Sequence, residues 1–205
     1  MDEYRNIANS YDLFTSPFLT PVRKEVARLV NNSECRRVLD ICCGTGTQLR
    51  MLNTSCIEAH GVDLSPAMLQ KAREKSPPAI SYHLEDASHL HFCDNTFGCA
   101  IISFALHEKD PDIRQAILSE AIRVLEPGGP LYVVDFLAPD TPLQQVGLRM
   151  ISLVEMAAGK SHYANFRSFI REGGMRRILE TSGFVPKEIS RYMFQTTGLY
   201  QVFNH

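Results

Sequence analysis

The sequence predicts an α/β fold in which a mostly parallel sheet is covered by helices on both faces. Short apolar runs rich in β-branched residues alternate with stretches of helical periodicity, which is typical of βαβ units. A turn with two closely spaced glycines, CCGTG at residues 42–46, directly follows the first of these runs. At 205 residues the chain is long enough for one well-buried core and short for two, so we expect a single domain over residues 1–205.

Seven apolar or alternating segments are the expected strands. Five of them should form the parallel part of the sheet: Arg37–Cys42, Ala59–Leu64, Ile80–Leu84, Cys99–Ala105 and Leu131–Phe136. The last two, Ile189–Phe194 and Leu199–Phe203, are expected to pair as a hairpin through Gln195–Gly198.

The helices between the strands have clear start signals. Ser65 and Pro66 provide an N-cap and a first helical position, and Asp110 with Pro111 does the same after the fourth strand. A segment with the helix-like spacing of Leu49, Met51 and Leu52 follows the glycine turn, so we also expect a helix there.

Both ends of the chain contribute further helices. A helix over Pro21–Val30 precedes the sheet, and residues 1–30 are expected to cap the sheet edge or the ligand cleft. Residues 139–172 are mostly helical in pattern and rich in Met and aromatic residues, so we expect them to form a lid over the substrate. Gly183 should end one more helix before the hairpin.

Composition excludes several classes of partner. Lys and Arg number 21 and Asp and Glu 23, which gives a formal charge of −2, whereas a nucleic-acid partner requires a basic face. No apolar run approaches a membrane span, and MDEYRNIANSYDLF lacks an apolar leader. Six cysteines without a C-x-x-C pair suggest buried thiols in a reducing cytoplasm and no metal site. We expect a cytoplasmic monomer or homodimer that acts on a small molecule.

The glycine turn is expected to bind a ligand, because ligands of open parallel sheets bind beyond the carboxyl ends of the strands. Gly44 and Gly46 lack the Cβ atoms that would keep a ligand from the main chain. A nicotinamide dinucleotide requires G-x-G-x-x-G, and the third glycine is missing because Leu49 stands in its place. No Lys-Ser or Lys-Thr follows, which excludes a P-loop.

Three acidic residues lie at or just after the ends of successive strands, which are Asp40, Asp63 and Asp86. A carboxylate after the second strand can accept hydrogen bonds from ribose hydroxyls, and one after the third can accept from an exocyclic amine. Each acid alone is most simply a helix cap or a solvated charge. Together, without a basic residue for phosphate, they favour a nucleoside that bears a cationic group.

The motifs as a set resemble those of class I S-adenosylmethionine-dependent methyltransferases. VLDICCGTG, GVDLSPAML, EDASHLHF, TFGCAIISFALHE and RVLEPGGPLYVVDF occur in the family's order and spacing over roughly residues 4–136. IANSYDLF and ISFALHE are most similar to the ubiquinone and menaquinone biosynthesis C-methyltransferase group. Cys42 stands where the family's loop commonly begins with glycine.

The resemblance implies a Rossmann-like fold, a seven-stranded sheet in the order 3-2-1-4-5-7-6, and methyl transfer from S-adenosyl-L-methionine to a small aromatic or apolar acceptor, with S-adenosyl-L-homocysteine as product. It implies that the glycine loop contacts the methionine moiety, Asp63 the ribose, and Asp86 the adenine. The cofactor-binding residues it implies are Tyr11 as a lid aromatic, Asp40, Cys42, Gly44, Thr45, Gly46, Asp63, Leu64, Met68, Asp86, Ala87, Ser103 and Phe104.

His107 is the candidate catalytic base, since it follows the fourth strand and imidazole titrates near neutrality. A hydrogen-bonded structural histidine is the alternative. His107, His162, Tyr163 and Phe166 are expected to contact the substrate, although the last three also fit an amphipathic surface helix. A nicotinamide-dependent oxidoreductase and a non-catalytic S-adenosylmethionine-binding relative remain the alternative functions.

Overall fold

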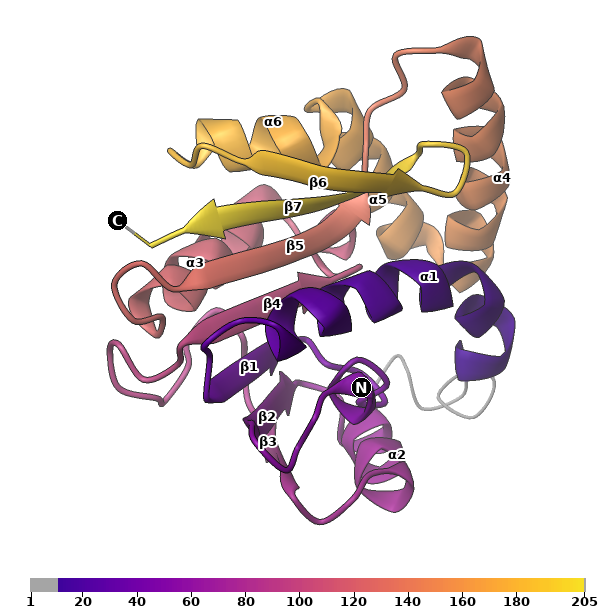
Figure 1. Ribbon diagram of the computed structural model, residues 1–205. Helices are drawn as coiled ribbons and strands as arrows, with labels where there is room; N and C mark the ends of the chain where they lie inside the picture. Colours follow the sequence, from indigo (N-terminus) through magenta and orange to yellow (C-terminus); the bar gives the residue numbers. More distant parts are fainter. Residues whose placement is uncertain (1–10, 205) are drawn as a thin grey trace.

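A seven-stranded sheet runs through the centre of the molecule in the order β3-β2-β1-β4-β5-β7-β6 (Figure 1). The order expected from the resemblance is confirmed. The computed structural model describes residues 11–204, without the side chains of residues 11–18 and 157–158. The strands are β1 (Arg37–Ile41), β2 (Glu58–Asp63), β3 (Ile80–Leu84), β4 (Cys99–Ser103), β5 (Pro130–Phe136), β6 (Lys187–Tyr192) and β7 (Thr197–Phe203).

The strands from β3 to β5 are mutually parallel, and β7 is antiparallel to both of its neighbours. β1 and β4 are buried along nearly their whole length, as expected for parallel strands covered on both faces. β4 ends at Ser103, two residues earlier than predicted. Phe104 has a left-handed φ of 54°, and the chain then turns into the short 3-10 helix η2 (Leu106–Glu108).

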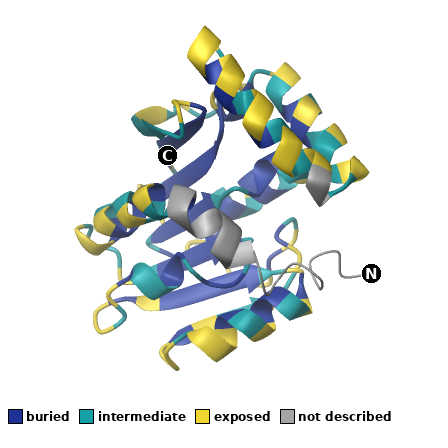
Figure 2. Ribbon diagram, turned by 90° about the vertical axis from the view of Figure 1, so that its right-hand side faces the viewer, coloured by how far each residue is buried: buried dark blue, intermediate teal, exposed yellow. Residues whose placement is uncertain are grey.

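Helices cover both faces of the sheet. α1 (Tyr11–Asn31) crosses one face, while α3 (Pro111–Arg123) and α6 (Gly174–Thr181) lie on the other (Figure 1). Two apolar clusters result, one on each face. In Figure 2 the central strands are buried, and the exposed residues lie mainly on the outer sides of the helices, in the loops and at the sheet edges.

α1 begins ten residues before the predicted start at Pro21. Its buried stripe begins at Leu19, before the predicted start, and continues through Val22, Val26 and Val30 at helical spacing. The helix starts predicted at Ser65–Pro66 and at Asp110–Pro111 are confirmed. The Ser65 hydroxyl accepts a hydrogen bond from the amide of Met68 at the start of α2 (Pro66–Lys75), and α3 begins at Pro111.

The helix expected after the glycine turn is absent; that prediction is wrong. Only one 3-10 turn, η1 (Leu49–Met51), forms there, with Leu49 and Leu52 as buried anchors. The segment then turns at Asn53, whose carbonyl accepts hydrogen bonds from the amides of Cys56 and Ile57. Asn and Ser favour such turns over helix, so the chain passes directly into β2.

Residues 139–172 are mostly helical as expected, and they form two helices. α4 (Pro142–Ala158) and α5 (Lys160–Arg171) are separated by Gly159, whose φ of 139° is accessible mainly to glycine. The hairpin β6–β7 is confirmed, but its turn lies two residues earlier, at Met193–Thr196. Within residues 11–204, none of the helices is both long and apolar enough to cross a bilayer.

Candidate active site

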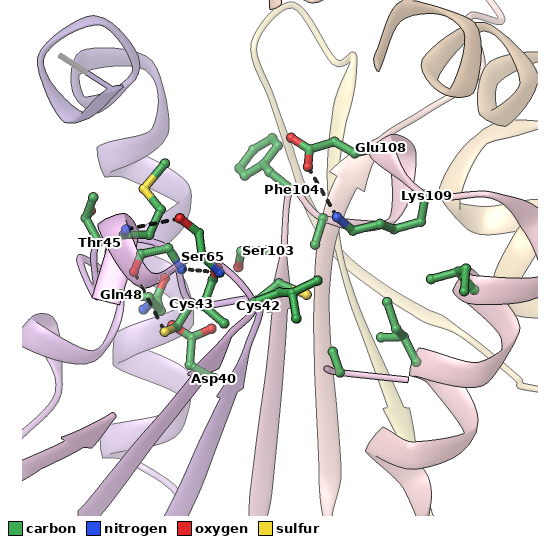
Figure 3. A pocket seen from close by; sticks show the side chains of 18 of the residues that line it. Asp40, Cys42, Cys43, Thr45, Gln48, Ser65, Ser103, Phe104, Glu108 and Lys109 are labelled. Atoms are coloured by element: carbon green, nitrogen blue, oxygen red, sulfur yellow. Dashed lines mark hydrogen bonds and ion pairs between the residues drawn. The ribbon is translucent and has the colours of Figure 1, made fainter. Parts of the chain in front are cut away.

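A cavity of about 550 Å³ lies at the carboxyl ends of β1, β2 and β4. In Figure 3, Asp40, Cys43 and Gln48 lie on one side of it, Phe104, Glu108 and Lys109 on the other, and Ser103 between them. Most of the predicted cofactor residues line this cavity: Asp40, Cys42, Gly44, Thr45, Asp63, Leu64, Met68, Asp86, Ala87, Ser103 and Phe104. Tyr11 begins α1, but its side chain lies outside the described residues.

The glycine loop has three left-handed residues, with φ of 60° at Cys42, 54° at Gly44 and 72° at Gly46. The two glycines serve different purposes. A Cβ on Gly44 would meet nothing within 4 Å, so the main chain there borders open space. A Cβ on Gly46 would lie 2.0 Å from the Tyr82 hydroxyl oxygen, so Gly46 is required by packing and does not line the cavity.

Asp63 ties the glycine loop to the next strand. Its Oδ2 accepts a hydrogen bond from the Gly44 amide at 2.8 Å, and its Oδ1 accepts one from the Ser65 amide at 2.9 Å. Burial raises the pKa of the Asp63 carboxyl, and these two amides oppose the rise. The carboxylate therefore lies at the edge of the cavity in a fixed orientation.

Asp86 and Asp40 differ sharply in their surroundings. Asp86 is exposed; the hydroxyl and amide of Ser88 donate to it and lower its pKa. Asp40 is only 2% exposed, and burial raises its pKa to about 8, although the charge of Arg23 opposes the rise. The Asp40 carboxyl therefore holds a proton to a higher pH than an exposed aspartate does.

The expectation that no basic residue borders the site is wrong. Arg23 from α1 and Lys109 after η2 both line the cavity. The Lys109 ammonium lies 3.8 Å from a carboxylate oxygen of Glu108. Lys109 is thus partly neutralised within the cavity wall.

His107 is buried, with 3% exposure, and does not line the cavity. Its Nδ1 lies 2.7 Å from the buried carboxylate of Asp135, and its Nε2 lies 3.7 Å from Glu155 and 3.9 Å from Glu108. Burial alone would lower the imidazole pKa, but Asp135 and the two glutamates raise it to about 9. The ring is therefore an imidazolium at neutral pH, and its role as a base stays a prediction.

The other predicted substrate residues divide between the cavity and the core. His162 on α5 lines the cavity, with Nδ1 3.8 Å from a carboxylate oxygen of Glu108. Phe166 is 1% exposed and packs edge-on against Phe136 in the core. Tyr163 packs at the margin of that core, with the Arg167 guanidinium 5.8 Å from its ring centroid.

Several lining residues were not predicted. Glu108 and Lys109 directly follow the predicted His107, so the FALHEK segment carried a signal for them. Asn165 lies on α5 between the predicted Tyr163 and Phe166, and its side-chain amide donates to the Glu108 carbonyl at 2.8 Å, which joins α5 to η2. The remaining unpredicted lining residues are Arg23, Cys43, Thr47, Gln48, Ser65, Ala105, Ile113, Ile117 and Ser161.

Comparisons with known proteins agree with the class that this fold and cavity define. A family model described as a methyltransferase domain matches residues 38–129. A demethylmenaquinone methyltransferase of Listeria monocytogenes is 35% identical over 214 residues, which cover 95% of this chain and 90% of that protein.

Solved structures show the same fold at low sequence identity. An S-adenosylmethionine-dependent methyltransferase from Thermotoga maritima superposes with a TM-score of 0.70 at 18% identity, covering 99% of this chain and 98% of that chain. An O-methyltransferase family protein from Burkholderia thailandensis superposes with a TM-score of 0.73 at 17% identity, covering 96% of this chain and 59% of that chain.

The chain belongs to the class I S-adenosylmethionine-dependent methyltransferases, and within them to the ubiquinone and menaquinone C-methyltransferase type. It is a methyltransferase that uses S-adenosyl-L-methionine as donor and releases S-adenosyl-L-homocysteine. A nicotinamide-dependent oxidoreductase is not favoured by these relatives.

Proposed function

We propose that this enzyme methylates a ring carbon of an apolar aromatic acceptor of the demethylmenaquinone class. Relatives that bear the name demethylmenaquinone methyltransferase support the acceptor class. The observation that carries the proposal is an exposed apolar stripe on α4, beside the helix α5 that contributes three residues to the cavity wall.

The α4 stripe consists of residues spaced so that they share one side of the helix: Leu143, Val146, Met150, Leu153 and Val154, each 54–64% exposed. Exposed apolar surface of this extent marks an interaction site in soluble proteins. The stripe offers a path for an apolar side chain that extends from the acceptor ring out of the cavity. A small polar acceptor would have no use for it.

The cavity fits S-adenosylmethionine on three observations. The open space at Gly44 admits a ligand against the main chain, and the acids at the ends of β2 and β3 accept hydrogen bonds as ribose hydroxyls and an adenine amine require. The Ser103 hydroxyl is buried without a partner among the described residues, so it is available to a ligand. We assign the ribose to Asp63 and the adenine to Asp86 and Ala87.

S-adenosylmethionine supplies a methyl group already activated by a positively charged sulfur. The protein therefore has to orient the acceptor, exclude water and take up the proton that a ring carbon releases. Glu108 is the group we assign to that proton, because its carboxylate lines the cavity and lies near His107, His162 and Lys109. His107 lies outside the cavity, with its Nε2 3.9 Å from the same carboxylate.

The experiment supplies purified enzyme with S-adenosylmethionine and either a short-chain or a long-chain demethylmenaquinol. We expect S-adenosylhomocysteine to form in step with an acceptor heavier by one methylene. Met150→Gln with Leu153→Gln should raise KM for the long-chain acceptor only, whereas Leu84→Gln, an exposed apolar residue on β3, should change neither KM. Methylation of polar amines in preference to both quinols would overturn the proposal.

A further inference from the structure

The β3 edge of the sheet carries a cluster of histidine and glutamate side chains that methyl transfer does not use. His83 on β3, Glu85 just after it and His91 on the following loop each have one ligand atom within 4.8 Å of the other two. No metal site was expected from the cysteine spacing. We propose that His83, Glu85 and His91 bind a divalent transition-metal ion, of which zinc is the primary candidate.

The strand pattern brings this cluster together. Residues two apart in a strand point to the same face of a sheet, which places Glu58 with His60 and His83 with Glu85. Val62 pairs in register with His83, so the two sets share one face. The loop after Glu85 then returns, and His91 Nδ1 lies 2.6 Å from Glu85 Oε2.

Hydrogen bonds fix which nitrogen of His83 is available to an ion. His60 Nε2 lies 2.8 Å from Glu58 Oε1, and a carboxylate only accepts, so Nε2 carries the proton. His60 Nδ1 is then the acceptor for His83 Nε2–H, 3.1 Å away. The lone pair of the neutral His83 ring is therefore on Nδ1.

This chain of bonds resembles the outer shell of a metal site, in which a ligating imidazole donates its other N–H to a further group. His83 Nδ1 faces Glu85 Oε1 at 3.9 Å, so two lone pairs oppose each other across this gap. Glu85 Oε1 is buried and accepts no hydrogen bond from the described residues. A cation between these atoms would satisfy both.

The donor set defines the class of ion. Two imidazole nitrogens and one carboxylate oxygen suit zinc, which holds such ligands at about 2.0–2.2 Å and leaves its fourth position to water. Calcium and magnesium prefer oxygen ligands only. The rings are held by stacking, with His60 and His83 centroids 5.4 Å apart and Phe92 edge-on to His83 at 5.2 Å. His91 is 64% exposed and has room to turn toward the ion.

The ion would join an edge strand to the loop that follows it. Glu85 directly precedes Asp86 and Ala87, which line the cavity. The ion would thus hold the segment from which these two residues reach the cavity, without being part of the cavity itself.

The test is a calorimetric titration of chelator-treated, dialysed enzyme with zinc chloride. Cys56 and Cys93 are exposed thiols, so all variants carry Cys56→Ser and Cys93→Ser to remove competing ligands. We expect one zinc ion per chain. His91→Ala should weaken binding at least tenfold, whereas His89→Ala, an exposed histidine on the same loop but outside the cluster, should bind as the parent does.

A second measurement separates ligation from folding. Zinc should raise the thermal midpoint of the parent protein but not that of Glu85→Gln, and the two midpoints should be alike without metal within a few degrees. The proposal is overturned if the parent shows no saturable zinc binding, or if His91→Ala and His89→Ala bind with equal affinity.

Discussion

The carboxylate of Asp63 accepts a hydrogen bond from the backbone amide of Gly44 at 2.8 Å, across the turn that joins β1 to η1. One oxygen thus anchors the loop that borders the cavity, while the other holds the Ser65 amide at the start of α2. The residue assigned to the ribose is also a structural clamp.

Asp63→Ala should therefore lower both cofactor affinity and stability. We expect S-adenosylhomocysteine affinity in calorimetry to fall at least a hundredfold. The free energy of unfolding should fall by about 1–3 kcal/mol, because two amides lose their acceptor. Asp94→Ala, a carboxylate 69% exposed and paired with Arg123, should change the affinity by less than about twofold and the stability by about 0.5 kcal/mol. Wild-type affinity in Asp63→Ala would refute the ribose assignment.

The two loop glycines should respond differently to alanine. Gly44→Ala and Gly128→Ala both place a Cβ in open space at positive φ, so each should cost about 1–2 kcal/mol of stability. Of these two variants, only Gly44→Ala should weaken S-adenosylhomocysteine binding. Gly46→Ala adds a clash with Tyr82 and should cost about 1–3 kcal/mol more than the other two in urea unfolding. Equal binding by the Gly44 and Gly128 variants would show that the ligand does not touch the main chain there.

Asp40 should make the protein less stable as the pH rises. Its pKa is raised by burial to about 8 in the folded protein, from 3.8 in the unfolded chain. Between these values the folded state holds a proton that the unfolded state has released, so the free energy of unfolding falls as the pH approaches 8. Asp40→Asn should remove this decline.

We expect the stability advantage of Asp40→Asn over the parent to grow by at least 1.4 kcal/mol between pH 5 and pH 8, since one unit of pKa shift corresponds to about that energy. Urea unfolding at the two pH values measures it, with Asp94→Asn as the control. A constant difference would show that Asp40 is ionised in the folded protein.

His107 should also make the protein less stable as the pH rises, but here the cause is the loss of a paired positive charge and not the ionisation of a buried acid. Its imidazolium is stabilised by Asp135, so its folded pKa of about 9 lies above the unfolded value of 6.5. Its contribution to stability is fully present below about pH 6.5 and is lost as the pH rises through 9. His107→Gln should cost about 3–5 kcal/mol at pH 6, because it leaves the buried Asp135 carboxylate without its cationic partner.

The matched control is the double variant His107→Gln with Asp135→Asn, which should recover most of that loss. Urea unfolding at pH 6 and pH 10 measures the difference in the free energy of unfolding between the parent and His107→Gln. This difference should be smaller at pH 10. A gap that does not change with pH would mean that the ring is neutral in the folded protein.

The positions of most strands and helices follow from short sequence patterns because each pattern has a local cause, whereas the strand order and the cofactor class were implied by the family resemblance of the motifs as a set. Ser65 with Pro66 fixes a helix start, and the apolar runs fix buried strands. The missing helix after the glycine turn was not predictable from spacing alone. Leu49 and Leu52 are apolar at helical spacing, but they serve as anchors of a single 3-10 turn.

The acceptor side of the cavity was less accessible to sequence analysis. His107 was selected for its ordinary pKa, yet a partner 28 residues away, Asp135, and the distant Glu155 decide its protonation. Phe166 and His162 lie on one helix, and only the packing of α5 against η2 decides which of them reaches the cavity. Long-range contacts of this kind leave no local pattern.

The position of β7 between β5 and β6 determines when the sheet can be completed during synthesis of the chain. β5 is made first, but the neighbour that saturates its free edge is β7, which follows about 60 residues later. β6 is made before β7, and β7 is its only pairing partner in the described sheet. Until β7 has been synthesised, the outer edge of β5 is unpaired in the nascent polypeptide. Unpaired strand edges of this kind are prone to aggregation and are protected by chaperones.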